Sequence, residues 1–175
     1  GGDGPARRVA GPWLRPAYAA GYPSEPLTPA LLAGLAPELL GHARLWPRYD
    51  ATHVSWQLGE MRKIVEQGEL RARLVRRDGA PVGWYVYYLK RGGVCRVFDL
   101  EAGPQHLDAG GGRPFAEADE DGAGALMGRM EPRLRGPMNR HRALLYNGGS
   151  LLMAHARDAS LVDDALLGRL AFSRM

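Results

Sequence analysis

The period of hydrophobic and polar positions changes near residue 69, and this change divides the predicted elements into two groups. Before it, leucines recur every three or four residues behind Thr28-Pro29, a capping residue followed by proline at the first helical position. This pattern predicts a helix over 29–43. A second apolar stripe with the same spacing predicts a helix that begins after Asp50 and ends near Gly68.

Further along the chain the period is that of strands. Asp78-Gly79 and Gly92-Gly93 separate three runs that are rich in valine, leucine and aromatic residues. Because such glycine pairs favour tight turns, the runs predict an antiparallel meander over 70–76, 82–90 and 94–100. The middle run carries aromatic residues on both faces, which is typical of a central strand covered on both sides.

The last third of the chain alternates helical and extended patterns, so the sheet should continue beyond the meander. The predicted elements are, in chain order, a short acidic helix from Pro114-Phe115, a strand over 123–130, a helix over 131–141, strands over 144–146 and 151–155, and a helix over 160–170. A short first strand is expected near Trp13-Leu14. This order predicts an α+β (mixed α/β) fold with a mixed, mostly antiparallel central sheet of about six to seven strands and helices on both faces.

Composition limits the class of protein. Of the 175 residues, 45% are hydrophobic and 24% are charged, which is ordinary for one globular domain. We expect a single domain over 1–175, with 1–10 outside its folded part. The only cysteine, Cys95, excludes an internal disulfide and a multi-cysteine metal site, and it favours a cytoplasmic protein with an inert core thiol. No apolar run approaches the roughly 18 residues of a membrane span, so no membrane partner is expected.

The charge of the chain is basic but evenly spread. The net charge is +4 with a pI near 9.5, and lysine occurs only at Lys63 and Lys90, so arginine supplies almost all the positive charge. A nucleic-acid site would require basic residues clustered with stacking aromatics, and the arginines are scattered instead. We therefore expect no nucleic-acid partner, whereas an anionic cofactor remains compatible with this charge.

A glycine-rich stretch follows the third strand of the meander. A strand, a glycine loop and a helix together present backbone amides to phosphate groups. The stretch from Gln105 to Gly110 resembles the Gln/Arg-x-x-Gly-x-Gly/Ala motif of the GNAT (Gcn5-related N-acetyltransferase) superfamily, whose amides hold the coenzyme A pyrophosphate. Asp108 stands where that motif has glycine, and its charge would repel a pyrophosphate. In this sequence the run from Gly110 to Arg113 would supply the pyrophosphate-binding backbone amides a few residues further along the chain. The positive charge of Arg113 would offset the negative charge of Asp108.

A second segment carries the same resemblance. Asn139, Ala143 and Leu145-Tyr146, followed by Gly149, are similar to the family's Asn…Ala…Leu-Tyr-x-x-Gly segment. The resemblance implies that Asn139 contacts the coenzyme and that Tyr146 protonates the departing thiolate. A rival interpretation is local, because Asn147-Gly148 is a strong hairpin signal. The middle strands also resemble the C-terminal half of a duplicated FemABX-like or polysaccharide-locus GNAT protein.

The resemblance implies an acyltransferase that moves an acetyl or other acyl group from acetyl-CoA or another acyl-CoA to a small-molecule or peptide amine. No metal is expected, because the histidines lack ligand spacing. For the base we favour Glu101, with Asp99 next, against the alternative that both are solvated carboxylates at a strand end. A catalytically inactive domain that serves as a scaffold or partner-binding half is the alternative function, and family members often form homodimers through sheet edges. The predicted catalytic residues are Glu101 and Tyr146, and the predicted cofactor-binding residues are Leu100, Glu101, Ala102, Gln105, Gly110, Gly111, Gly112, Arg113 and Asn139.

Three other interpretations follow from single segments. The glycine triplet superficially resembles the loop of S-adenosylmethionine-dependent methyltransferases, but Gly103-Pro104-Gln105 interrupts the strand that such a loop requires. The carboxylates of 117–121 lack the alternation of a calcium loop and predict a solvated helix end. The aromatic residues of the middle strand fit either the core or an acceptor groove, with the core favoured.

Overall fold

The structure is a computed structural model that describes residues 21–141, 143–144 and 155–171. Its sheet has five strands in the order β1-β2-β3-β4-β5, of which the first four are antiparallel and β5 lies parallel to β4. The strands are β1 (Ser24–Pro26), β2 (Glu69–Arg77), β3 (Ala80–Leu89), β4 (Val94–Ala102) and β5 (Ala125–Met127). The predicted fold class and meander are confirmed, with fewer strands than expected.

The difference in strand number has two sources. The strands predicted at 144–146 and 151–155 fall mostly outside the described residues, as does the one near Trp13-Leu14. Within the described part, β1 occupies Ser24–Pro26, a segment without apolar alternation that the sequence did not single out. Pro26 is tolerated there because β1 pairs with β2 on one side only.

Two capped helices lie between β1 and β2. Helix α2 (Pro29–Leu40) begins at Thr28, whose side chain accepts from the Leu31 N–H at 3.2 Å, and it continues through an internal proline. Helix α3 (Ala51–Arg62) begins at Asp50 in the same way. Both predicted starts are confirmed. The stripe of the second helix ends early, however, since Val65 lies in the 3-10 turn η2 (Val65–Gln67) and its side chain is 77% exposed.

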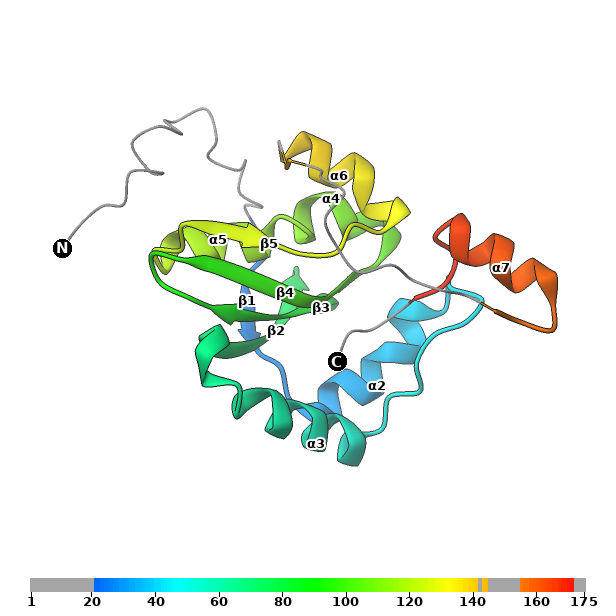
Figure 1. Cartoon of the computed structure of the whole chain (residues 1–175), viewed down its shortest axis with the longest axis horizontal. Helices are drawn as coiled ribbons and strands as arrows, with labels where there is room; N and C mark the ends of the chain where they lie inside the picture. The colour runs from blue at the N-terminus through cyan, green and yellow to red at the C-terminus, as the bar shows by residue number, and fades with distance from the viewer. Residues whose placement is uncertain (1–20, 142, 145–154, 172–175) are drawn as a thin grey trace.

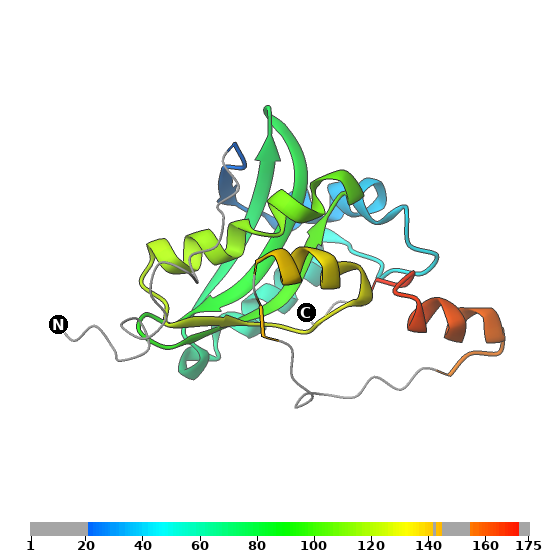
Figure 2. The same ribbon diagram turned by 90° about the horizontal axis from the view of Figure 1, so that it is seen from above.

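The sheet has helices on both faces (Figures 1 and 2), and a separate core of buried side chains lies on each face. Trp84, Val86 and Tyr88 of β3 pack against α2 and α3 on one face. The alternate residues Tyr85 and Tyr87 face the other side, which α5 (Arg113–Glu120) covers. These aromatic residues are at most 1% exposed, so their predicted place in the core is confirmed. Burial also raises the pKa of the Cys95 thiol, which packs in the second core.

The connection from β4 to β5 crosses the second face. It contains the 3-10 turn η3 (Pro104–His106), the short helix α4 (Leu107–Gly110) and α5. After β5 come the 3-10 turn η4 (Pro132–Leu134) and α6 (Arg135–Arg140), which confirm the helix predicted over 131–141. Helix α7 (Ala159–Leu166) lies beside the loop after α2, where Leu45 and Leu170 form a bridge (Figure 1). In the described part of the chain, no helix is long and apolar enough to cross a membrane.

Candidate functional site

The candidate site lies where β4 and β5 separate. The two strands pair only over 94–96 and 125–127, and beyond that point the described residues contribute no strand to the edge of β4 that faces away from β3. The carbonyl of Leu100 accepts from Arg133 Nη2 at 3.4 Å, so it faces this open edge. Because alternate residues of a strand direct their N–H and C=O groups to the same edge, Ala102 faces it as well. The edge therefore presents backbone groups to whatever lies between β4 and the chain after β5.

Glu101 is the buried carboxylate of this edge. It is only 4% exposed and is held by a two-point ion pair with Arg133 of η4. Arg133 Nη2 donates to Oε1 at 2.5 Å and Nη1 donates to Oε2 at 2.7 Å. The third nitrogen, Nε, donates to Glu131 at 2.9 Å. No local pattern in the sequence marks Arg133, which lies 32 residues further along the chain.

Burial raises the pKa of Glu101 to about 7, while the hydrogen bonds and charge of Arg133 oppose the rise. Asp99 and Glu131 add a smaller increase through their negative charge. A carboxyl group in this range can gain and lose a proton near neutral pH, which is the requirement for a general base. Glu101 therefore is the carboxylate predicted to be the base, and its pKa allows it to gain and lose a proton near neutral pH.

Asp99 lies two residues earlier on β4 and is 6% exposed. It accepts from Trp84 Nε1 at 3.0 Å, and burial raises its pKa to about 6. The alternative that Asp99 and Glu101 are solvated carboxylates is therefore wrong. The reason is that this end of β4 is covered by the indole of β3 and by η4, neither of which is local in sequence.

The glycine stretch after β4 is helical. Gly111 N–H donates to the Leu107 carbonyl at 3.1 Å, and Gly112 N–H donates to the Ala109 carbonyl at 3.3 Å. Both glycines have right-handed helical angles, so they join α4 to α5 as one bent helical segment. These two N–H groups are therefore already occupied in this arrangement, and their role in cofactor binding stays a prediction.

The charged groups near this stretch are paired. Asp108 forms an ion pair with Arg140 of α6, and its carbonyl lies 3.2 Å from His141 Nε2. Arg113 binds Glu120 through both terminal nitrogens at 3.2 and 3.0 Å. Its Nε also donates to Ser24 Oγ of β1 at 3.4 Å, so all three nitrogens of Arg113 have partners.

The remaining predicted residues are spread around the site. Gln105 is exposed in η3, Gly110 is buried at the end of α4, and Asn139 is exposed on α6. Tyr146 lies outside the described residues. The structure therefore brings Leu100, Glu101 and Ala102 together on one strand edge, with the glycine stretch directly after them.

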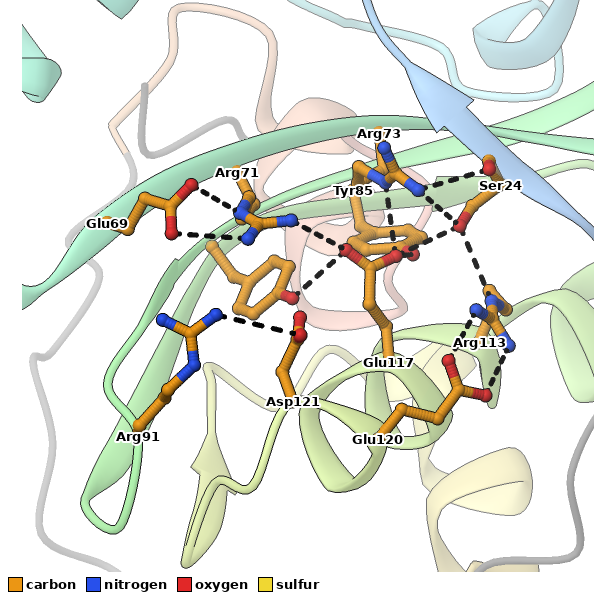
Figure 3. Close-up of polar contacts among 11 residues, drawn as sticks. Ser24, Glu69, Arg71, Arg73, Tyr85, Arg91, Arg113, Glu117, Glu120 and Asp121 are labelled. Atoms are coloured by element: carbon orange, nitrogen blue, oxygen red, sulfur yellow. Dashed lines mark hydrogen bonds and ion pairs between the residues drawn. The ribbon is translucent and has the colours of Figure 1, made fainter.

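A second polar cluster lies under α5 and centres on Glu117 (Figure 3). This carboxylate is 5% exposed and accepts from Tyr85 Oη at 2.5 Å, Ser24 Oγ at 2.9 Å, Arg73 Nε at 3.1 Å and Tyr87 Oη at 3.2 Å. Burial alone would raise the pKa of Glu117, but these donors outweigh it and hold the pKa below its ordinary value. The prediction of a solvated helix end is wrong for this residue.

A signal for this cluster was present in the sequence. Arg71 and Arg73 alternate along β2, and Tyr85 and Tyr87 alternate along β3, so the donors of both strands share the face that α5 covers. Buried donors require acceptors, and Glu117 is the one acidic residue of α5 that is buried. With its oxygens saturated, Glu117 anchors α5 to the sheet and is not available for chemistry.

Comparisons with known proteins agree on the fold. No family model matches the chain, and no curated protein matches it in sequence. Among solved structures, glucosamine-6-phosphate N-acetyltransferase from Arabidopsis thaliana matches with a TM-score of 0.50 and 10% identity, over 78% of this chain and 99% of that one. An acetyltransferase from Trypanosoma brucei matches with a TM-score of 0.49 and 15% identity, over 77% and 99% of the two chains. The protein AAC(6')-Iy, in complex with the bisubstrate analog CoA-S-monomethyl-acetylneamine, matches with a TM-score of 0.45 and 14% identity, over 78% and 97% of the two chains. At these identities the likeness is one of fold, and the chain has the GNAT-like fold that the sequence predicted.

Proposed function

We propose that the protein is a GNAT-like acyltransferase that moves an acetyl or other acyl group from acyl-CoA to an amine. The observation that carries this proposal is the open edge of β4, which combines backbone hydrogen-bonding groups with the buried carboxylate of Glu101. The fold shared with an N-acetyltransferase adds support for the same reaction class by analogy of fold alone.

Each part of the edge has a role in this reaction. Backbone groups of Leu100 and Ala102 would hold the acyl donor and polarise its thioester carbonyl. Glu101 would take a proton from the acceptor nitrogen as that nitrogen attacks the carbonyl carbon. The carbon–sulfur bond then breaks, and the departing thiolate takes a proton, for which Tyr146 remains the predicted donor. Asp99 would keep the acceptor end of the site negative.

The glycine stretch favours a second candidate. The N–H groups of Gly111 and Gly112 are engaged within the helix, and Asp108 places a carboxylate beside them. A domain that no longer holds a pyrophosphate would have this arrangement and would serve as a scaffold or partner-binding half. The resemblance to one half of a duplicated FemABX-like protein fits this second candidate.

Titration with acetyl-CoA separates the two candidates. A ligand present at 100 times its Kd stabilises the folded state by about 2.7 kcal/mol, which raises Tm by roughly 5–11 °C in a chain of this length. The acyltransferase is expected to show this rise, and the scaffold is expected to show none at millimolar acetyl-CoA. Turnover with a panel of amines can then be followed with a thiol reagent, because the only cysteine of the chain is buried.

A variant of the base completes the test. Glu101→Gln should retain the thermal shift and lose turnover by about 10²–10⁴-fold, the usual contribution of a general base. Glu120→Gln, a change of the same chemistry at an exposed position, is the matched control and should leave turnover unchanged. Full turnover in Glu101→Gln would contradict the assigned role, and the absence of any shift in the wild type would overturn the acyltransferase.

A further inference from the structure

One charged group at the open edge has no part in the reaction described above. We propose that Arg133 is the positioning residue of this site, which holds the Glu101 carboxylate in a fixed plane beside β4. The inference rests on the proposed function and concerns the same site.

The guanidinium of Arg133 is held in one orientation by its hydrogen-bond partners. Its guanidinium binds both oxygens of Glu101, the Leu100 carbonyl and Glu131, so all three nitrogens are engaged. Glu131 is held in turn by Arg129 at 2.8 Å. A planar guanidinium can satisfy a carboxylate at two points, whereas a lysine ammonium can satisfy it at one. The plane of the Glu101 carboxylate is therefore set by Arg133.

The turn that carries Arg133 is itself supported on both sides. The next residue, Leu134, is 4% exposed, and its N–H donates to the Glu131 carbonyl at 2.9 Å. Pro132 packs against Gly168, where an added Cβ would lie 2.8 Å from the proline Cβ. The segment that contains Gly168 therefore packs against η4. A residue on a braced turn can hold its partner more firmly than one on a free loop.

The charges that face Glu101 make the effect measurable. Arg133 and Glu131 approach it from the chain after β5, and Asp99 approaches it from β4, with Arg129 close to Asp99. Arg133 is the cation that opposes the rise in the Glu101 pKa caused by burial. Removing it should raise this pKa further, and the acid limb of the pH–rate profile should move to higher pH.

The test compares Arg133→Met and Arg133→Lys with Arg129→Met, which removes the neighbouring guanidinium that binds Glu131. Glu101 is titrated by NMR through its labelled carboxyl carbon, a readout that requires no activity. We expect Arg133→Met to raise the pKa by about one unit or more, Arg133→Lys to raise it less, and Arg129→Met to leave it nearly unchanged. In kinetic experiments, Arg133→Lys should lower kcat, because a lysine keeps the positive charge but binds the Glu101 carboxylate at one point and not at two. KM for acetyl-CoA should stay the same.

The outcomes separate this inference from the proposed function. If the wild type neither binds nor turns over acetyl-CoA, the proposed function fails and the positioning role fails with it. If the wild type is active but Glu101 titrates alike in the wild type and Arg133→Met, the inference alone is overturned. An Arg129→Met variant that matches Arg133→Met would also overturn it, since the effect would then be one of general charge. If Arg133→Met does not fold, the pKa of Glu101 in Arg133→Lys is compared with that in the wild type.

Discussion

Glu117→Gln is expected to destabilise the protein strongly, because one carboxylate accepts from four donors on three elements of the sheet face. The amide has nearly the same shape but only one oxygen, whereas in the wild type Oε2 accepts from Tyr85, Ser24 and Arg73 and Oε1 accepts from Tyr87. Arg73, whose side chain is 20% exposed, would keep its positive charge and lose the negative charge of its ion-pair partner. Removing one member of a buried ion pair costs about 3–5 kcal/mol, so we expect about 3 kcal/mol for this partial loss. In a chain of this length the corresponding decrease in Tm is roughly 6–12 °C.

The pH dependence provides the decisive assay. The folded-state pKa of Glu117 is lowered, so its stabilisation is present above the ordinary glutamate pKa of about 4.3 and is lost as the pH falls through the folded value. The variant has no carboxylate to protonate. Denaturant unfolding should therefore show a gap between wild type and variant that is constant from pH 7 to 5 and narrows below pH about 4.

The matched control lies on the same helix. Glu120→Gln removes an exposed carboxylate that is paired with Arg113, and it should cost less than about 1 kcal/mol. Equal losses for the two variants, or a Glu117→Gln gap that does not change in acid, would refute the assignment of Glu117 as the buried anchor of α5.

Two further predictions concern the packing around the site. Gly83→Ala would place a methyl group against the backbone of β4, so it should lower the free energy of unfolding by about 1–3 kcal/mol. Gly59→Ala is the control, because the space around Gly59 is open, and it should be neutral or stabilising by up to about 1 kcal/mol. Arg44→Ala should increase hydrogen exchange in α7, because Arg44 donates to three side chains of that segment, while the exposed Arg62→Ala should have no such effect.

Local signals account for the parts of the fold that could be predicted. Thr28-Pro29 and Asp50 mark helix starts through side-chain capping, which depends only on neighbouring residues. Asp78-Gly79 marks a hairpin because both residues adopt a positive φ, of 49° and 82°, as a two-residue turn of this kind requires. In contrast, β1 exists because Glu25 pairs with Leu74, and no local pattern encodes that pairing.

The residues of the site show the same difference between local signals and long-range contacts. The position of Glu101 at the end of a strand could be predicted from the sequence, because a turn and a glycine stretch follow it. Its burial could not be predicted, since the groups that cover it lie on β3 and η4. The burial of Glu117 could not be predicted for a related reason. A run of acidic residues indicates a solvated face unless the donors on another element are known to face it.

The energetics of the open β4 edge are those that the proposed acyltransferase would require. Asp99 and Glu101 have folded-state pKa values of about 6 and about 7, both above their ordinary values, so the stability that they contribute is full below pH about 4 and is lost as the pH rises toward 7. A buried ion pair such as Glu101–Arg133 is often replaced by apolar residues of similar volume without loss of stability. A domain that only supported a partner would gain from that replacement. The carboxylates therefore weaken the fold at neutral pH, at the one strand edge where the proposed acyl transfer requires a group that exchanges protons.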